Sequence, residues 1–336
     1  MHFLRFAGLA LVPAVVLIVP WRLAAQTTPA QSELRAAVTR ALPLINKAAV
    51  GHTQQRSCFS CHHQTMAVLA LTTARAHGFT VDEAAVGAQT RFTAEFLSRN
   101  RESFRAGKGT GGQADSAGYA LWTLAGGGWA GDETTAAVAE YLLRRDADLD
   151  HWRNVSTRPP TEASAFTTTF VALRGLKQYA TAEQVERANA RLAQARDWLL
   201  KAQPLDTEDR VFRLRALKLV GAPSESVQRA ALELKTTQRD NGGWAQTDAL
   251  APDAYATGSA LAALHEASGL PVTEAAYRRG LAFLLRTQLP DGSWQVKSRS
   301  KPFQEYFESG FPHGADQWIS MPATAWATVA LTLACE

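Results

Sequence analysis

The chain has 336 residues, of which 46% are hydrophobic and 20% are charged, and its formal net charge is +4. This length allows two ordinary domains or one large domain built from repeats. The lysines and arginines are scattered along the chain rather than grouped, which argues against nucleic acid as a main partner.

Residues 1–25 have the features of a secretory signal peptide. A short polar start precedes an apolar run, residues 6–20, which is too short and too interrupted by proline to favour a membrane span. Small residues suit cleavage after Ala25; the alternative is an uncleaved anchor, because Trp21 extends the apolar character. We therefore expect a periplasmic or secreted mature chain, residues 26–336, with no stable membrane span after cleavage.

Two turns in the second half of the chain share one pattern. Residues 238–244 contain a glutamine, an Asp-Asn-Gly-Gly turn and a tryptophan, and residues 288–294 repeat the glutamine, the acidic-glycine turn and the tryptophan. A repeat of this kind indicates an array of similar structural units.

Six apolar segments share a small or polar residue followed by leucine, and the successive leucines lie 53, 49, 44, 47 and 67 residues apart. The segments are 69–71, 122–124, 171–173, 215–217, 262–264 and 329–331. A longer, more charged segment with 3.6-residue apolar spacing precedes each one. These segments predict helices over roughly 32–50, 82–99, 132–146, 183–202, 224–238 and 273–288.

The pattern predicts six helical hairpins. Amphipathic first helices that cover apolar second helices are what a ring of two layers requires, and small residues such as Ala256, Gly258 and Ala260 allow close helix approach. Six hairpins can close on themselves and leave no exposed ends. We therefore predict one all-α domain over residues 26–336, a closed α/α toroid of about six helical hairpins.

Two long segments interrupt the rhythm of the hairpins. They are the connection 147–163 and an aromatic-rich insertion, 295–320. Long loops of this kind bind ligands or brace the scaffold. The glycine-rich segment 107–112 lacks the residue order of a phosphate-binding loop, so we interpret it as a connector.

The Gln/Gly/Trp turns at 238–244 and 288–294 resemble the QW repeats of the squalene and oxidosqualene cyclases. The hairpin series resembles the α/α toroid that those cyclases share with protein prenyltransferase β-subunits and thioester-containing complement domains. The resemblance implies the toroid fold and an apolar or isoprenoid-like ligand. The D-x-D-D motif of hopene-type cyclases is absent, since the nearest stretch is 146–150, and Cys335 lies far from any Asp/Cys/His zinc set. Triterpene cyclase activity is therefore not expected, and enzyme activity stays open.

A Cys-x-x-Cys-His motif occupies residues 58–62. Cys58 and Cys61 can form thioethers to one porphyrin, and His62 can then supply an axial nitrogen, as in c-type haem attachment. The alternatives are a short disulfide, or a zinc site formed by the two thiols with His62 and His63. The favoured cofactor is haem c, with His62 as a ligand of the haem iron.

Closure of the ring suggests a second iron ligand. The last hairpin would lie beside the first and bring Met321 close to His62, and methionine is a common partner of histidine in electron-transfer haems. Met321 is therefore the expected distal ligand of the haem iron, with His63, Met66 and His313 as alternatives. An ordinary core methionine is the competing interpretation.

The starts of all inner helices are expected to gather at one end of the ring. They carry polar residues that serve either as helix caps or as a ligand site. These residues are Asp115, Ser116, Tyr119, Glu162, Thr167, Thr207, Glu208, Asp209, Arg210, Asp253, Tyr255 and Thr257. The loop residues expected to overhang this end are His151, Trp152, Arg158 and His313. The candidates for cavity chemistry are Tyr119, His151, Glu162, Asp209, Asp253 and His313.

These features predict an exported c-type cytochrome built on a toroid, which would serve electron transfer with a redox partner protein. Two other hypotheses stay open. One is a haem-free toroid that binds an apolar or polymeric ligand. The other is an enzyme of the cyclase or lyase type that uses a carboxylate or a Tyr/His pair in the central cavity.

Overall fold

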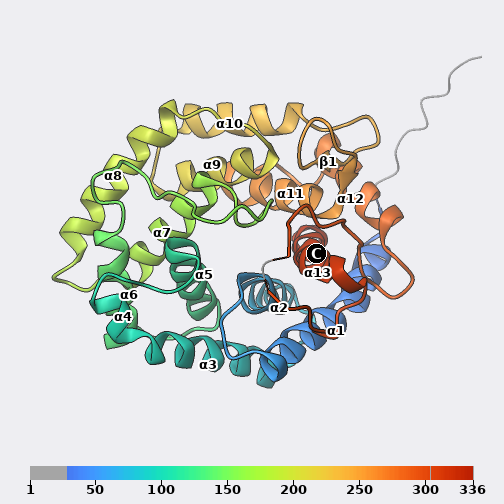
Figure 1. The fold of residues 1–336 in the computed structure, drawn as a ribbon. Coiled ribbons are helices and arrows are strands. Elements are labelled where there is room, and N and C mark those ends of the chain that lie inside the picture. Colours follow the sequence, from blue (N-terminus) through green and yellow to red (C-terminus); the bar gives the residue numbers. More distant parts are fainter. Residues whose placement is uncertain (1–28, 303, 336) are drawn as a thin grey trace, which may run out of the picture.

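The computed structural model describes residues 29–302 and 304–335, so the expected signal peptide lies outside the described residues. Helices dominate the described chain and form two concentric rings (Figure 1). None of these helices is both long enough and apolar enough to span a lipid bilayer. The prediction of an all-α toroid is confirmed.

The inner ring of the described chain is rich in small and apolar side chains. Its helices are α2 (Met66–Ala76), α5 (Gln113–Gly126), α7 (Ala165–Tyr179), α9 (Thr207–Leu219), α11 (Ala254–Ser268) and α13 (Gln317–Thr332). The outer, amphipathic helices are α1 (Gln31–Gln55), α3 (Glu83–Arg99), α6 (Glu133–Arg144), α8 (Val185–Lys201), α10 (Ser224–Thr236) and α12 (Ala275–Thr287). Each outer helix precedes its inner partner, which confirms the six predicted hairpins.

Shorter elements connect the helices. A π-helical turn, η1 (Cys61–Thr65), leads into α2, and a 3₁₀ turn, η2 (Gly314–Asp316), leads into α13. One helix, α4 (Arg101–Arg105), lies between α3 and α5. The antiparallel pair β1 (Trp244–Ala245) and β2 (Pro252–Asp253) joins the repeated turn to α11.

Two glycines allow inner helices to approach each other closely. A Cβ on Gly118 of α5 would lie 2.6 Å from the backbone carbonyl carbon of Val171 in α7. A Cβ on Gly258 of α11 would lie 2.5 Å from the carbonyl carbon of Trp326 in α13. Side chains do not tolerate such distances, so a larger residue at either position would push the two helices apart.

The ring closes between its first and last hairpins, and α1 and α13 lie side by side (Figure 1). The side-chain amide of Gln31 donates to the backbone carbonyl of Ala334 at 3.0 Å. The amide of Gln288, which follows α12, donates to the carbonyl of Ala37 in α1 at 2.9 Å. The glutamine of the second repeated turn therefore connects the last outer helix to the first one.

The tryptophans of the two repeated turns hold their hairpins together in the same way. The indole N–H of Trp244 donates to the carbonyl of Leu234 at 2.9 Å, and that of Trp294 donates to Leu284 at 2.9 Å. Both rings are buried. Each ring therefore fills the space between the two helices of its hairpin and also satisfies a carbonyl at the end of the outer helix.

Trp152 plays the same part in the third hairpin. Its indole N–H donates to the carbonyl of Leu142 at 3.0 Å, and its backbone N–H donates to the hydroxyl of Thr169 in α7 at 3.1 Å. Trp152 was expected to overhang the end of the ring, but the residue is fully buried. It is a copy of the repeated turn without the glutamine and the glycine.

The insertion predicted over residues 295–320 is shorter than expected, because α13 begins at Gln317. The side chain of Gln317 is fully buried and accepts a hydrogen bond from the backbone N–H of Ser309 at 2.8 Å. It also donates to the carbonyl of Phe307 at 3.0 Å. Pro322 lies inside α13.

Replacing Trp244 by alanine is expected to lower the free energy of unfolding by about 3–5 kcal/mol, because it removes a buried indole and leaves the Leu234 carbonyl without its donor. Trp244→Phe is expected to cost less, because it keeps most of the ring and loses a hydrogen bond worth about 1 kcal/mol. Denaturant unfolding followed by circular dichroism measures both. Leu205→Ala is the control, because Leu205 is 85% exposed. Equal stability of Trp244→Ala and Leu205→Ala would contradict the assigned role.

Candidate active site

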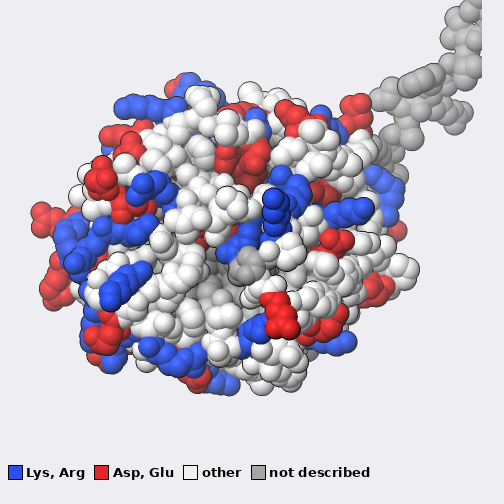
Figure 2. Space-filling view, viewed as in Figure 1, with Lys and Arg blue, Asp and Glu red and all other residues white. Residues whose placement is uncertain are grey.

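The inner helices all begin at the same end of the ring, which we call the mouth and define by Cys61, Asp115, Glu162, Glu208 and Asp253. The connection between α6 and α7 crosses the ring toward α9 and α11 (Figure 1). Figure 2 shows the molecule from the same side. Uncharged side chains occupy much of the middle of this face, and lysine and arginine side chains gather beside it.

Side chains inside the ring lie in layers because the inner helices run parallel. On α5, Asp115 and Tyr119 are four residues apart, and Trp122 follows three residues later, so all three share one helix face. On α9, Glu208 and Phe212 repeat this spacing. Both α5 and α9 therefore carry an acidic group at the mouth and an aromatic ring one turn below it.

The aromatic layer continues from helix to helix. Tyr119 stacks on Trp122 with ring centres 6.0 Å apart, and Trp122 contacts Phe170 of α7 at 5.5 Å. Phe170 lies 5.4 Å from Phe212 of α9, and Phe212 lies 6.5 Å from Trp326 of α13. All five rings are buried and form one continuous layer. The floor beneath the mouth is therefore largely apolar and aromatic.

Asp115 is 2% exposed and has a single hydrogen-bond donor on one of its oxygens. The hydroxyl of Thr168 in α7 donates to Asp115 Oδ1 at 2.6 Å. Oδ2 is buried without a hydrogen-bond partner. Burial raises the pKa of Asp115 to about 7, although the Thr168 hydrogen bond acts in the opposite direction. The carboxyl group can therefore hold a proton near neutral pH.

Glu208 is the second buried acid of the mouth. The hydroxyls of Thr167 and Tyr255 donate to Glu208 Oε1 at 3.0 and 3.3 Å, and Oε2 is buried without a partner. Burial, reinforced by the nearby Asp206 carboxylate, raises the pKa of Glu208 well above its ordinary value. Thr161, in the connection that crosses the mouth, donates to the Tyr255 hydroxyl at 3.1 Å. This chain of contacts links α7, α9 and α11.

Cys61 and His62 face Glu162 at the third polar position of the mouth. The thiol of Cys61 donates to Glu162 Oε1 at 2.9 Å, and His62 Nδ1 lies 3.7 Å from the same oxygen. Burial and the Glu162 carboxylate raise the pKa of the Cys61 thiol, so the thiol keeps its proton. Arg158 forms an ion pair with Glu162 Oε2. Cys61 and His62 belong to the π-helical turn η1, and π-helical turns are common at functional sites.

Four of the cavity candidates lie at or near the mouth. Tyr119 lies on the buried face of α5, and Glu162 contacts Cys61. Asp209 accepts hydrogen bonds from Ser164 at 2.6 Å and from the backbone N–H of residue 205 at 2.9 Å. Asp253 accepts from the backbone N–H of residue 256 at 2.9 Å, which is the role of a helix cap. Asp209 and Asp253 therefore have structural partners, whereas Glu162 is surrounded by reactive groups.

The two histidine candidates, His151 and His313, have partners other than the residues that define the mouth. His151 stacks on Trp198 of the outer helix α8, with ring centres 4.4 Å apart. His313 Nε2 lies 2.8 Å from the hydroxyl of Ser293, next to the second repeated turn. Met321 is fully buried within α13. These contacts tie His151 and His313 to the scaffold.

The residues of the Cys-x-x-Cys-His motif lie in different environments. Cys58 is exposed and Cys61 is buried, and both thiols are free. His63 is fully buried and stacks on His52, with ring centres 4.8 Å apart. The chain therefore directs Cys61 and His62 toward Glu162, and His63 into the protein core.

Asp115 and Glu208 were expected at the mouth as helix caps or as part of a ligand site, but not among the candidates for cavity chemistry. Their positions in the sequence contain a usable signal. Each acid lies four residues before an aromatic residue on an inner helix, Tyr119 or Phe212, and so shares its buried face. An acid on the apolar face of a buried helix is a stronger candidate for function than an acid on a solvent-exposed cap.

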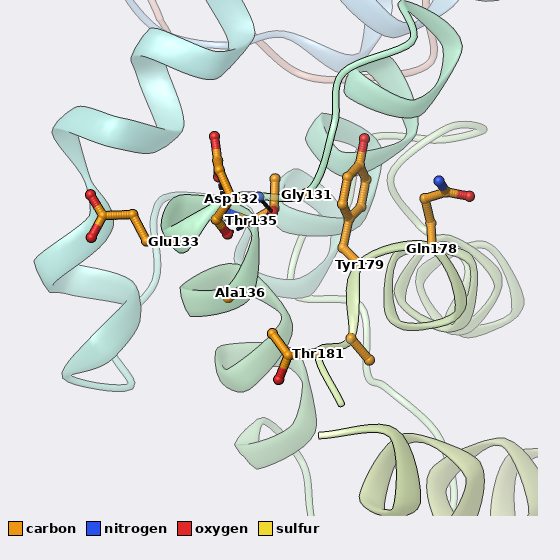
Figure 3. Close-up of a pocket in the computed structure, with 9 residues that line it drawn as sticks. Gly131, Asp132, Glu133, Thr135, Ala136, Gln178, Tyr179 and Thr181 are labelled. Carbon is orange, nitrogen blue, oxygen red and sulfur yellow. Dashed lines mark hydrogen bonds between the residues drawn. The ribbon is translucent and has the colours of Figure 1, made fainter. Parts of the chain in front are cut away.

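A surface groove of about 390 Å³ lies at the other end of the ring, between the start of α6 and the end of α7 (Figure 3). Asp132 is its most prominent acid. Its carboxylate accepts hydrogen bonds from the backbone N–H groups of Thr134 and Thr135 and from the indole of Trp129. These contacts cap α6 and leave little acid–base capacity, so the groove is a structural feature.

Asp115→Asn is expected to remove one pH-dependent contribution to stability. Because the folded-state pKa of Asp115 lies above its unfolded value, the folded chain holds this proton more tightly, and stability falls as the pH rises through that interval. We expect the free energy of unfolding of the wild type, relative to Asp115→Asn, to fall by about 2–4 kcal/mol between pH 4.5 and 7.5. Denaturant unfolding at several pH values measures this difference.

Asp132→Asn is the matched control for Asp115→Asn. Hydrogen bonds from Thr135, Trp129 and Thr134 lower the pKa of Asp132, although partial burial acts in the opposite direction. Asp132 is therefore ionised throughout pH 4.5 to 7.5 in both the folded and the unfolded chain. The free energy of unfolding of the wild type relative to Asp132→Asn is therefore expected to stay constant over this pH range. If the free energy of unfolding of the wild type relative to Asp115→Asn is also constant over this pH range, the raised pKa of Asp115 is contradicted.

No family model and no curated protein matches the chain. The type II terpene cyclase MstE from Scytonema matches it with a TM-score of 0.58 and 14% identity, over 91% of this chain and 99% of that one. A variant of that cyclase in complex with its substrate, geranylgeranyl dihydroxybenzoate, matches with a TM-score of 0.57 and 14% identity, over 91% and 98%. A possible GH105 family member from Salmonella enterica subsp. enterica serovar Paratyphi A matches with a TM-score of 0.52 and 14% identity, over 96% and 99%. These likenesses show a shared α/α toroid fold.

Proposed function

We propose that the chain is an enzyme that uses Asp115 as a general acid on an apolar, unsaturated substrate bound at the mouth. The observation that carries this proposal is the carboxyl group of Asp115, which is buried above an aromatic floor and has one oxygen without a hydrogen-bond partner. This oxygen, Asp115 Oδ2, would hold the transferable proton.

The surroundings of Asp115 suit proton donation near neutral pH. A general acid works best when its pKa is close to the working pH, and burial brings the pKa of Asp115 to about 7. The Thr168 hydroxyl occupies Oδ1, which leaves Oδ2 for the proton. Asp115 does not belong to a D-x-D-D motif, so burial rather than a paired acid keeps it protonated.

The aromatic layer can stabilise the positive charge that protonation leaves on a hydrocarbon. Transfer of a proton to a carbon–carbon double bond breaks the O–H bond of Asp115, forms a C–H bond and leaves a carbocation. The faces of Tyr119, Trp122 and Phe212 can stabilise such a positive charge through cation–π attraction. Loss of a neighbouring proton from the cation, with solvent reprotonating Asp115, then gives a product of unchanged mass.

The comparisons support an isoprenoid-like substrate. The Scytonema cyclase with the matching fold binds geranylgeranyl dihydroxybenzoate, and such a substrate combines an unsaturated chain with a polar head. The mouth combines the corresponding groups, since the aromatic layer is apolar and the buried side chains of Glu208 and Tyr255 are polar. This favours the cyclase-type hypothesis over the electron-transfer hypothesis.

Covalent haem at Cys58, Cys61 and His62 stays a prediction, as do Met321 as the distal ligand, the redox partner, and export to the periplasm or beyond. The buried Cys61 thiol contacts Glu162, and Cys58 is exposed. Attachment of one porphyrin to both thiols would therefore require the segment around Glu162 to move away from Cys61.

Asp115→Asn is expected to lower turnover at least about 100-fold, because an amide cannot donate the proton. The mature chain is incubated with geranylgeranyl dihydroxybenzoate and with geranylgeraniol, and isomers of unchanged mass are measured by liquid chromatography and mass spectrometry. Quenching of tryptophan fluorescence reports binding separately. Binding is expected to persist in Asp115→Asn, and Asp132→Asn is expected to match the wild type in both measurements.

Two results would overturn the proposal. Equal turnover in the wild type and Asp115→Asn would remove Asp115 as the acid. Absence of both binding and turnover of the two probes by the folded wild type would remove isoprenoids as the substrate class.

A further inference from the structure

Three side chains of the types that bind metal ions, from two distant segments of the chain, meet at the mouth. Cys61 Sγ lies 3.3 Å from His62 Nδ1, and Glu162 Oε1 lies 2.9 Å from that sulfur and 3.7 Å from that nitrogen. A thiol, an imidazole and a carboxylate are the donor types of protein zinc sites. We propose that Cys61, His62 and Glu162 bind one zinc ion.

The three donor atoms already lie close to the required separations. Zinc bonds of about 2.0–2.3 Å with tetrahedral angles place neighbouring donor atoms about 3.3–3.7 Å apart. The two separations that involve His62 Nδ1 fall in this range. The sulfur–oxygen distance is shorter because the thiol proton forms a hydrogen bond there. On binding, this proton leaves to solvent, a sulfur–zinc bond forms, and the distance opens by about 0.5 Å.

The backbone holds the donors on both sides of the site. Gln64 Oε1 accepts a hydrogen bond from the backbone N–H of Ser60 at 2.9 Å, which fixes the start of the π-helical turn that carries Cys61 and His62. On the other side, Arg158 and Glu162 exchange two backbone hydrogen bonds, at 3.1 and 3.0 Å. Both segments are therefore anchored before an ion arrives.

Arg158 also orients the carboxylate of Glu162. Its guanidinium group pairs with Oε2, which leaves Oε1 directed at the sulfur of Cys61 and the imidazole of His62. A partner of this kind, which binds a ligand rather than the metal, fixes the geometry of metal sites in general. The positive charge of Arg158 also balances the carboxylate while the site holds no ion.

This ligand set differs from the four-residue zinc site that the sequence suggested. Cys58 is exposed, and His63 stacks on His52 in the core, so neither belongs to the set. Three protein ligands leave a fourth position for water or substrate, as in catalytic rather than structural zinc sites. The inference goes beyond the proposed function and does not depend on it, because Asp115 is not a ligand.

Titration of the metal-free mature chain with Co²⁺ tests the site, because a thiolate bound to cobalt gives a charge-transfer absorption band. We expect one cobalt ion per chain, displaced by one equivalent of zinc as measured by elemental analysis. Cys61→Ser and Glu162→Gln each remove a direct ligand and are expected to weaken cobalt binding more than about 100-fold. Loss of a residue that only orients a ligand already weakens metal binding by up to about 100-fold. Cys58→Ser and Asp132→Asn are the controls and are expected to bind as the wild type does. Circular dichroism confirms that each variant is folded.

Three results would overturn the zinc site. The first is the lack of a thiolate–cobalt band in the folded wild type. The second is an unchanged band in Cys61→Ser. The third is covalent haem that requires both Cys58 and Cys61 when the chain is exported from a host with cytochrome c maturation machinery, because the sulfur of Cys61 would then be a thioether.

Discussion

The structure depends on backbone contact between neighbouring inner helices. Gly118 lies against the backbone of Val171, and Gly258 lies against that of Trp326, so the helices approach more closely than side chains would allow. This closeness brings the starts of parallel helices within reach of each other. The hydrogen bond between Thr168 and Asp115, which are 53 residues apart in the sequence, is one result. Helix packing therefore sets the dimensions of the mouth as well as the stability of the ring.

Most of the fold could be predicted from the sequence because each hairpin repeats the same local requirements. Amphipathic spacing marks the outer helices, small residues mark the inner ones, and the turns that end in Trp244 and Trp294 reveal the repeat. The burial of Trp152 was not predicted, because its turn lacks the glutamine and glycine of the pattern. Its buried position depends on a hydrogen bond to the carbonyl of Leu142 in the preceding helix, and no residue type in the sequence indicates this bond.

The site could be predicted only in part. The helix-face spacing between Asp115 and Tyr119 is local, so sequence alone can place both inside the ring. The contact between Cys61 and Glu162 joins residues 101 positions apart and depends on the path of a connection without regular structure. That path is held by the hydrogen bond from Thr161 to Tyr255, a tertiary contact with no periodic signal. The Cys-x-x-Cys-His motif was therefore visible in the sequence, but its carboxylate neighbour was not.

Buried charged groups at both ends of the ring have atoms without hydrogen-bond partners. At the mouth, Asp115 Oδ2 and Glu208 Oε2 are buried without hydrogen-bond partners, and each such group costs about 1–3 kcal/mol. At the other end, Arg215 forms an ion pair with Glu266 at 2.6 Å and lies over the ring of Trp326, although its Nε is buried without a partner. Stability alone would favour partners for the mouth acids, or apolar residues in their place. In the proposed function, Asp115 Oδ2 gains its partner from the substrate, because the proton that it donates is the one transferred.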